Sequence, residues 1–351
     1  SYYSEDKESE YIKKAQKYGL WKDGLPNGDM ALSREQFGAV IYELVKDEDV
    51  INEAKTLPYE STYMYKDEAL AVYNRGIMLD GSIGESFSPT KEITREDAVK
   101  LVMMCIDSSR RIKITMPDYT ALEEMLKEKM SGWQGDWSLC FEDYTTGNRI
   151  SINSHQVYSA SLIKLFVAQA VYQRISDGNM AETAKVNDEL RKMITYSDND
   201  AWKYLARQLG GGSYSSGMSR VTQLAKASGF ADTGTFYQGE HKNYNFTSVN
   251  DCCAFLRGVL DGIIVNKECS DKLLALLKQQ QHTQKIPAGI PDTVVTANKT
   301  GELDYIQGDA AIVFAPSGTY ILCIIGDDLN DAYGQIDKFI DLSKIVYEYL
   351  N

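Results

Sequence analysis

The chain lacks the features that mark several large classes of protein. It has no run of about 18 apolar residues, so we expect no membrane-spanning helix. Lysine and arginine number only 37 against 50 aspartates and glutamates, which gives a net charge of -13. Nucleic acids and anionic membranes need a basic surface, and we therefore predict neither as a partner. An anionic substrate would require a local positive site.

Cysteine and histidine are also scarce. The six cysteines show neither the paired spacing of a zinc site nor the density of a disulfide scaffold, so we interpret them as small buried residues. We expect no metal and no cofactor. His155, His241 and His282 allow a Ser-His-Asp triad in principle, but no Gly-x-Ser-x-Gly sequence accompanies them. Surface histidines are the simpler interpretation.

Length and composition favour two domains. A chain of 351 residues exceeds one typical domain, and 43% hydrophobic residues can form a sizeable core. We predict one domain over residues 1–110 and a second over residues 115–351. The opening segment, residues 1–6, is polar and acidic, so we expect any export signal to have been removed.

An internal repeat organises the first domain. Residues 11–46 and 67–106 each contain two glycines five positions apart, followed by Ser/Thr-Arg-Glu before an amphipathic stretch. The hydroxyl can cap a helix and the acid favours its positive end. We therefore predict two helix–loop–helix copies that pack on each other. The residues that carry the pattern are Gly19, Gly24, Ser33-Arg34-Glu35, Gly76, Gly81 and Thr94-Arg95-Glu96.

This pair of copies resembles the S-layer homology repeats of bacterial cell-surface proteins, over residues 3–46 and 65–107. The resemblance implies a location outside the cell or at its surface, and a possible cell-wall polymer as a partner. S-layer modules usually occur in threes, whereas two copies are present here. A purely structural role for the pair stays open.

The second domain has strand patterns at its two ends and helical patterns between them. This order suggests that the two terminal segments meet in one sheet, and it therefore predicts an α+β fold. We expect an antiparallel sheet flanked by helices, with an all-helical lobe inserted between its first and last strands. The predicted strands are 137–141, 149–152, 310–314 and 320–325, and the predicted helices are 122–130, 162–175, 181–194, 201–209, 221–227, 249–260 and 336–350.

Three short motifs follow one another along this domain: Ser161-Leu162-Ile163-Lys164, Ser197-Asp198-Asn199 and Lys299-Thr300-Gly301. Each has a plain structural interpretation on its own, as a helix cap, a polar turn or an edge strand that ends in a glycine bulge. In this order they resemble the motifs of class A β-lactamases and penicillin-binding proteins. The resemblance covers residues 115–351 and implies that family's fold and serine chemistry.

The resemblance also implies catalytic roles. Ser161 would attack an acyl carbon, and Lys164 would accept its proton because a serine hydroxyl is a weak nucleophile without a base. Backbone N–H groups of Ser161 and Glu302 would form the oxyanion hole. Ser197 would pass a proton to the leaving nitrogen.

Substrate-binding roles follow in the same way. Asn199 would hold the substrate amide, while Lys299, Thr300 and Gly301 would bind the substrate carboxylate. Lys299 would then supply the local positive charge that this acidic protein otherwise lacks. No arginine follows Arg257 in the chain, so no arginine on the closing strands can assist.

Release of the acyl group is harder to assign. Class A β-lactamases place a glutamate in a Glu-x-x-x-Asn loop to activate the deacylating water. We expect a loop over residues 229–247, where Glu240 is the only glutamate, but asparagines follow it at positions three and five rather than four. Glu240 is either a deacylation residue or a solvated carboxylate.

We therefore predict an exported, extracellular or cell-surface serine hydrolase that forms an acyl-enzyme at Ser161. Its substrates would be β-lactams or D-alanyl-D-alanine-type cell-wall peptides. Two alternatives remain: a slow penicillin-binding or sensory module, and a cell-wall anchor whose hydrolase fold no longer turns over.

Overall fold

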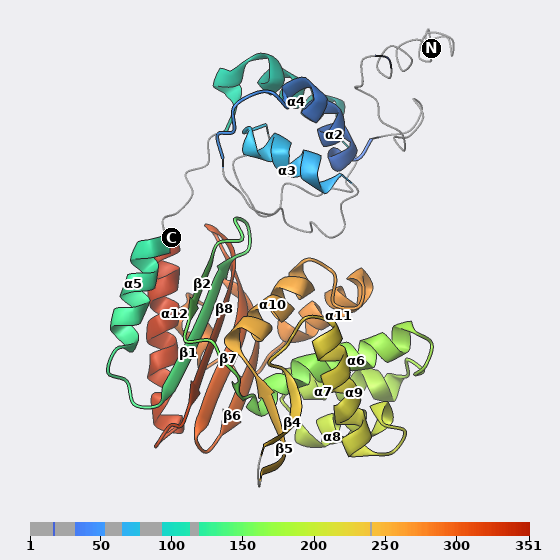
Figure 1. Cartoon of the computed structure of the whole chain (residues 1–351), viewed down its shortest axis with the longest axis vertical. Coiled ribbons are helices and arrows are strands. Elements are labelled where there is room, and N and C mark those ends of the chain that lie inside the picture. The colour runs from blue at the N-terminus through green and yellow to red at the C-terminus, as the bar shows by residue number, and fades with distance from the viewer. Residues whose placement is uncertain (1–16, 18–31, 53–64, 78–92, 113–118, 239–240) are drawn as a thin grey trace. The chain divides into compact units, whose positions relative to one another are not determined.

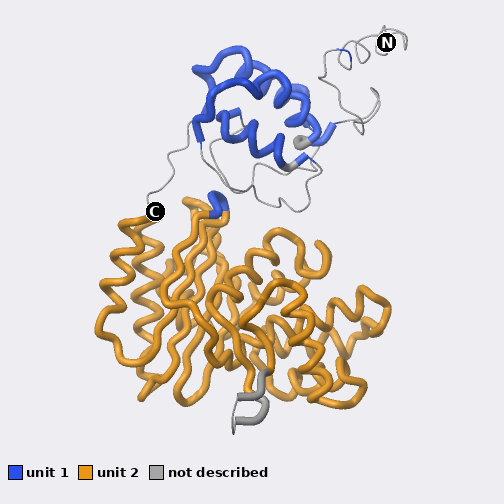
Figure 2. The backbone as a smooth tube through the Cα atoms, in the orientation of Figure 1, with its two compact units in different colours: residues 1–117, 145–147 blue, residues 118–144, 148–351 orange. Residues whose placement is uncertain are grey.

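The chain divides into two compact units in the computed structural model. Unit 1 comprises residues 1–117 with 145–147, and unit 2 comprises residues 118–144 with 148–351 (Figure 2). No helix in the part of the chain that the structure describes has the length and apolarity needed to cross a membrane. The described residues are 17, 32–52, 65–77, 93–112, 119–238 and 241–351.

Unit 1 is helical, and both Ser/Thr-Arg-Glu sequences begin helices as predicted. The Ser33 side chain accepts a hydrogen bond from the Gln36 N–H, and the Gln36 side chain accepts one from the Ser33 N–H. The Thr94 hydroxyl accepts from the Asp97 N–H in the second copy. The helices of this unit are α2 (Arg34–Val45), α3 (Lys66–Asn74), α4 (Arg95–Ile106) and the 3₁₀ turn η2 (Ser108–Arg110).

The copies in unit 1 share one apolar core. Ile41 and Val45 from α2 pack with Val72 and Ile77 from the α3 region and with Leu101 from α4. Residues of both predicted copies therefore contribute to the same hydrophobic core. The predicted first helix of the first copy, before residue 32, lies outside the described residues apart from Lys17.

A five-stranded antiparallel sheet forms the centre of unit 2, in the order β2-β1-β8-β7-β6. The first and last parts of the domain meet in this sheet: β1 pairs with β8, with Leu139 opposite Ile324. The predicted α+β fold is confirmed. The strands are β1 (Asp136–Asp143), β2 (Arg149–Ile152), β6 (Val295–Leu303), β7 (Ile306–Ala315) and β8 (Gly318–Asp327).

Helices cover both faces of this sheet (Figure 1). Apolar residues of α5 and α12, such as Leu122 and Phe339, form a core with one face. The other face packs against α10 and the inserted helical lobe, which share a second core that includes Phe166 and Phe255. The helices are α5 (Tyr119–Met130), η3 (Ala160–Leu162), α6 (Ile163–Ser176), α7 (Ala184–Thr195), α8 (Asn199–Leu209), α9 (Tyr214–Ala227), α10 (Val249–Leu260), α11 (Lys267–Leu277), η4 (Ile286–Gly289), η5 (Tyr333–Gln335) and α12 (Ile336–Leu350).

The region predicted as a loop over residues 229–247 is different in the structure. It forms β4 (Gly234–Gln238) and β5 (His241–Thr247), and β5 pairs with β3 (Val157–Tyr158) in a second, three-stranded sheet. The loop prediction was wrong, since β4 and β5 pair with each other as a hairpin and β5 also pairs with β3, which lies far away in the sequence. Helix α11 was also missed, although Asn266 caps it through the Cys269 N–H.

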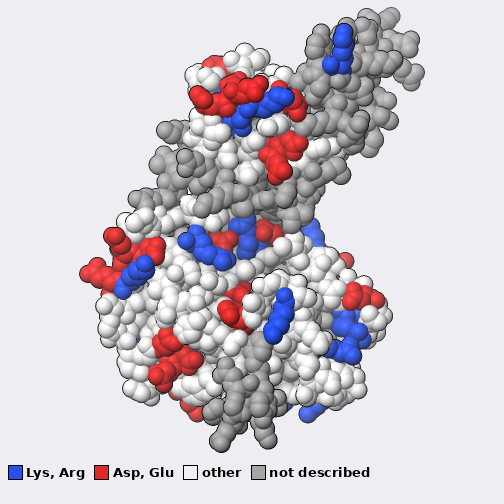
Figure 3. Space-filling view, in the orientation of Figure 1, with Lys and Arg blue, Asp and Glu red and all other residues white. Residues whose placement is uncertain are grey.

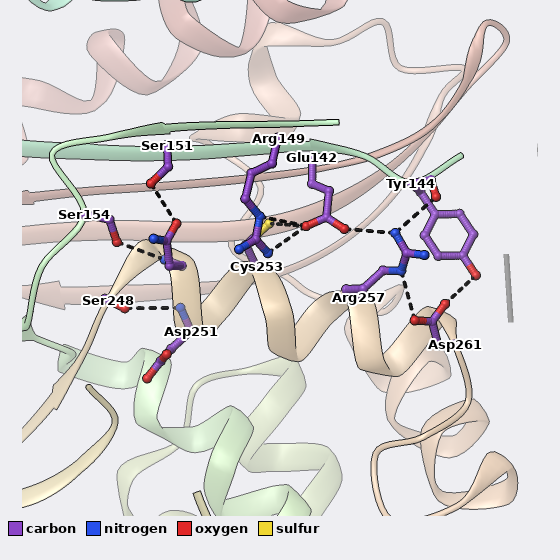
Figure 4. Close-up of polar contacts among 11 residues, drawn as sticks. Glu142, Tyr144, Arg149, Ser151, Ser154, Ser248, Asp251, Cys253, Arg257 and Asp261 are labelled. Carbon is purple, nitrogen blue, oxygen red and sulfur yellow. Dashed lines mark hydrogen bonds and ion pairs between the residues drawn. The ribbon is translucent and has the colours of Figure 1, made fainter. Parts of the chain in front are cut away.

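An ion-paired group of side chains joins β1 and β2 to α10 (Figure 4). Glu142 accepts from Arg149 (Nη2–Oε2, 2.7 Å) and from Arg257 (Nη1–Oε1, 2.9 Å). Arg257 also donates to Asp261 (Nε–Oδ2, 2.9 Å), and its guanidinium lies 4.6 Å from the centre of the Tyr144 ring. We call Glu142, Arg149, Arg257 and Asp261 the α10 cluster. Its two cations balance its two anions.

The surface of unit 2 carries mixed charge. On the face shown in Figure 3, acidic and basic side chains are interspersed. Among the described residues of that face, no broad basic stripe of the kind that follows a nucleic-acid backbone is visible.

Candidate active site

The Ser161 turn is held tightly against the edge strand of the main sheet. Ser161 lies in the 3₁₀ turn η3, directly before α6, and Ala160 has a left-handed backbone with φ 44°. Such a conformation costs a non-glycine residue about 1–2 kcal/mol, so the surrounding packing must enforce it. A side chain at Gly301 would put its Cβ 2.9 Å from the Ser159 carbonyl oxygen. Glycine at this position therefore permits the close approach of η3 and β6.

Lys164 lies one helical turn after Ser161 and connects the first two motifs. Its Nζ is 2.9 Å from Ser161 Oγ and 2.8 Å from Asn199 Oδ1. It also donates to the backbone carbonyl of Ser197 and lies 3.3 Å from that residue's Oγ. The amine thus contacts the nucleophile and both polar residues that flank Asp198.

Burial sets the proton affinity of Lys164. The side chain is 1% exposed and makes no ion pair with a carboxylate among the described residues. Burial lowers its pKa to about 8, and the negative charge of Asp198 opposes this only in part. A lysine with this pKa has a substantial neutral fraction near neutral pH and can accept the Ser161 proton.

Ser197 links the two lysines of the motifs. Its Oγ accepts from Lys299 Nζ at 2.8 Å and lies within reach of Lys164. Its backbone is left-handed, with φ 56°, and Asp198 then caps α8 by accepting from the Ala201 N–H. The cap fixes the direction in which α8 leaves, which holds Ser197 between the two amines.

Lys299 on β6 is fully buried. Its Nζ contacts Ser197 Oγ and the Thr300 carbonyl oxygen. Burial holds its pKa well below the usual range, and the nearby charge of Lys164 lowers it further. Asp309, on the neighbouring strand β7, is also fully buried, and burial raises its pKa to about 6. The charged forms of Lys299 on β6 and of Asp309 on β7 are therefore both disfavoured by burial.

A cavity of about 240 Å³ opens beside the nucleophile. Ser161 and Glu302, whose backbone N–H groups were predicted to form the oxyanion hole, both line it, as do Lys164 and Asn199. Lys299, Thr300 and Gly301 are not among its lining residues. The remaining lining residues are Tyr158, Ala160, Ile163, Trp202, Tyr244, Asn245 and Leu303.

The β4–β5 hairpin contributes Tyr244 and Asn245 to this cavity. Asn245 is held firmly: its Oδ1 accepts from Thr235 Oγ1 at 2.7 Å, and its carbonyl oxygen accepts from the Ser159 N–H at 2.9 Å. Glu240, the deacylation candidate from the sequence, lies outside the described residues. An aromatic and an amide are therefore the described groups that this hairpin presents.

Several of these residues were not predicted from the sequence. Trp202 follows Asn199 by three positions on α8, a spacing that places both side chains on one helix face and could have identified it. Tyr158 and Tyr244 meet only through the pairing of β3 with β5, with ring centres 5.2 Å apart. No local sequence signal marks this pair.

The histidines and cysteines take no described part in the cavity. His155 contacts Asp136 at the surface, and His282 lies near the Tyr196 carbonyl oxygen. The side chain of His241 is not among the described groups. All six cysteines are free, and five of them are buried. No three described His, Cys, Asp or Glu side chains are arranged to hold a metal ion.

Comparison with known proteins assigns this unit to a family. Solved structures with a similar fold include PBP-A (21% identity, TM-score 0.58, 67% of this chain and 98% of that chain). A β-lactamase from Chitinophaga pinensis is also similar (17% identity, TM-score 0.60, 66% and 100%). No curated protein sequence matches the chain. The sequence profile of the beta-lactamase enzyme family matches residues 121–189 and 180–350, well over half of the chain. The chain therefore belongs to the beta-lactamase enzyme family.

Proposed function

We propose that the protein is a serine acyl-transfer hydrolase that forms an acyl-enzyme at Ser161 with β-lactams or D-alanyl-D-alanine-type cell-wall peptides. The observation that carries this proposal is the unbroken chain of contacts from Ser161 through Lys164 and Ser197 to Lys299. The proposed nucleophile Ser161 and the proposed base Lys164 thus line one cavity, and the proposed hydroxyl relay, Ser197, contacts Lys164.

The chemistry follows from these positions. Neutral Lys164 takes the Ser161 proton as Oγ bonds to the carbonyl carbon, and the Ser161 and Glu302 N–H groups receive the negative charge on oxygen. The carbon–nitrogen bond then breaks, and the proton passes from Lys164 through Ser197 to the departing nitrogen. Asn199 can donate its amide NH₂ to the substrate because its Oδ1 already accepts from Lys164.

The test is acylation by a fluorescent penicillin, followed by intact-mass measurement of the protein. We expect one covalent adduct on the wild type and none on Ser161→Ala. Ser151→Ala, which removes an exposed serine that contacts Asn250, is the matched control and should be acylated like the wild type. The proposal fails if the wild type gains no adduct and turns over neither substrate class.

A slow penicillin-binding or sensory module is the second candidate. It is favoured by Tyr244 and Asn245, since neither residue is a base that could activate a deacylating water. One of the similar structures is described as an acyl-enzyme complex of a PBP-A mutant with penicillin G. An adduct that persists for hours without product would support this candidate, and multiple turnovers would exclude it.

We also infer that the protein is exported and that the repeats in unit 1 bind cell-wall polymer. The two capped helices and their shared core support an S-layer-homology-like unit. The full chain should sediment with purified cell walls. It should no longer sediment with walls from which the non-peptidoglycan polymers have been extracted. Equal sedimentation with both preparations would contradict polymer binding and leave a structural role.

A further inference from the structure

Two of the three lysines of the catalytic region, Lys285 and Lys299, do not line the cavity, and the third, Lys164, lines it with very little exposed surface. A carboxylate is much more exposed there. Lys164 is 1% exposed, and Lys285 and Lys299 are fully buried. The Glu302 side chain is 29% exposed and lines the cavity. Among the described lining residues Glu302 carries the only carboxylate. The more exposed of the two charged groups that line the cavity is therefore a carboxylate.

Lys285 explains why Glu302 is fixed in this position. This lysine precedes η4, and its Nζ donates to the Gly308 carbonyl oxygen at 3.2 Å and pairs with Glu302 Oε1 at 3.0 Å. The ring of Phe339 lies 5.5 Å from the same amine. Lys285 is thus a buried cation beside β6 whose carboxylate partner comes from the protein itself.

Strand geometry places this pair where a substrate anion would bind. Side chains alternate along a strand, so Thr300 and Glu302 share one face of β6. The family resemblance assigns the substrate carboxylate to Lys299 and Thr300. Lys299 donates to Ser197 and to the Thr300 carbonyl oxygen and does not line the cavity. The Glu302 carboxylate on Lys285 therefore takes the place, and the charge, of an incoming carboxylate.

We propose that Glu302 is a specificity-determining residue that slows acylation by substrates with a free carboxylate beside Thr300, free β-lactam acids and D-alanyl-D-alanine peptides included. Preferred substrates carry a neutral or cationic group there, such as an ester, an amide or an ammonium. This inference rests on the proposed acyl transfer at Ser161 and names its substrate class. Like charges a few ångströms apart at a partly exposed site discriminate by roughly tenfold to a hundredfold.

The test compares two substrates that differ only in this charge, benzylpenicillin and its methyl ester. We expect the wild type to be acylated about tenfold or more faster by the ester, measured as the second-order rate constant of acylation. Glu302→Gln keeps the shape and the backbone N–H but removes the charge, and it frees Lys285 for the substrate. It should be acylated faster by the free acid than by the ester.

Asp304→Asn is the matched control. It removes the same charge two positions away, from an exposed residue that does not line the cavity, and should leave the wild-type preference unchanged. Ionic strength gives a second measurement that needs no variant. Salt screens like-charge repulsion, so benzylpenicillin acylation of the wild type should accelerate with salt while ester acylation stays constant.

The outcomes separate this inference from the proposed function. If both penicillins acylate the wild type but the free acid is preferred, or if Glu302→Gln slows both equally, the inference is overturned and acyl transfer stands. If neither penicillin acylates it, the proposed function fails. Ligand-observed NMR with phenylacetylglycine and its primary amide then tests Glu302 directly. Tighter wild-type binding of the amide, lost in Glu302→Gln, supports exclusion of the carboxylate, and equal binding overturns it.

Discussion

Two groups of charged side chains in unit 2, the α10 cluster and the lysines of the catalytic region, differ in how their charge is balanced. In the α10 cluster, Arg149 and Arg257 each contact a carboxylate within 3 Å. In the catalytic region, Lys164 and Lys299 contact hydroxyl groups, carbonyl oxygens and an amide, and no described carboxylate. The side chains of Arg149 and Arg257 are 34% and 14% exposed, whereas Lys164 is 1% exposed and Lys299 is fully buried. The cations that are paired with carboxylates are therefore also the less buried ones.

The pairing with carboxylates suits the α10 cluster to a structural role, and the lack of such pairing suits the two lysines to a chemical role. Paired charges stay ionised and hold β1 and β2 to α10, although burial still raises the pKa of Glu142. Unpaired amines lose protons more easily, as the pKa of Lys164 near 8 shows. Burial without a carboxylate partner therefore costs stability at Lys164 and favours the neutral amine that the proposed mechanism needs, whereas the charges of the α10 cluster are paired.

The largest expected effect is that of Lys164→Met. Acylation by benzylpenicillin should fall by roughly 10²–10⁴-fold because the base is lost. The folded-state pKa of Lys164 lies below the unfolded value of about 10.4, so this residue costs stability progressively as the pH falls from about 10.4 to 8, and the full cost is present at pH 7. Removing it should stabilise the protein by about 0.5–2 kcal/mol at pH 7, measured by urea unfolding. Loss of stability together with undiminished acylation would contradict both assignments.

Arg257→Met should give the reverse pattern. It leaves Glu142 and Asp261 buried with less compensation, and we expect a loss of about 3–5 kcal/mol in the free energy of unfolding. Acylation by the folded protein should stay within about twofold of the wild-type rate, since Arg257 donates hydrogen bonds to Glu142, Tyr144 and Asp261, and none of these belongs to the three motifs. Arg191→Met is the control: its pair with Asp188 is exposed and should contribute about 1 kcal/mol or less.

Gly301→Ala tests the contact between η3 and β6. The added Cβ would meet the Ser159 carbonyl oxygen and the Leu162 N–H, which are backbone atoms, so the nucleophile must shift. Acylation should fall by up to about 10²-fold. Gly308, which pairs with Gly301 across the strands, would place its Cβ against the flexible end of Leu162. Gly308→Ala should therefore lose much less activity, and equal losses would argue against a specific role for the η3 contact.

The smallest effect concerns pH. In the proposed mechanism neutral Lys164 is the base, so the acylation rate should rise with pH and level off above about 8, with the rate at pH 7 roughly tenfold below the plateau. The pH profile of Arg257→Met should match that of the wild type. A profile that is flat between pH 6 and 9 would assign the proton transfer to another group.

The sequence predicted the parts of unit 2 that depend on local pattern. Ser161 and Lys164 lie one helical turn apart, and Ser197 and Asn199 lie at the start of α8, so local spacing brings together the residues within each motif. The contact between the two motifs was predicted from the family resemblance. The sheet strands were predicted because their apolar runs and turn residues are close in sequence.

What the sequence did not reveal depends on distant pairing. The β4–β5 hairpin mixes polar and aromatic residues, and its strand β5 pairs with β4 and also with β3, which lies far away in the sequence. Lys285 stands in an ordinary polar stretch, and its role arises when η4 brings it beneath β6. The exposure of the Glu302 carboxylate could not be predicted either, because a sequence motif does not tell which of its side chains are buried.

The pairing of β1 with β8 also bears on how the protein is made. β1 is synthesised early, yet one of its two neighbours in the sheet is among the last strands of unit 2 to be translated. Contacts so distant in sequence form slowly. During synthesis β1 has an unpaired edge and an uncovered apolar face, which exposes it to aggregation. Chaperones should therefore bind the nascent chain between the emergence of β2 and that of β8.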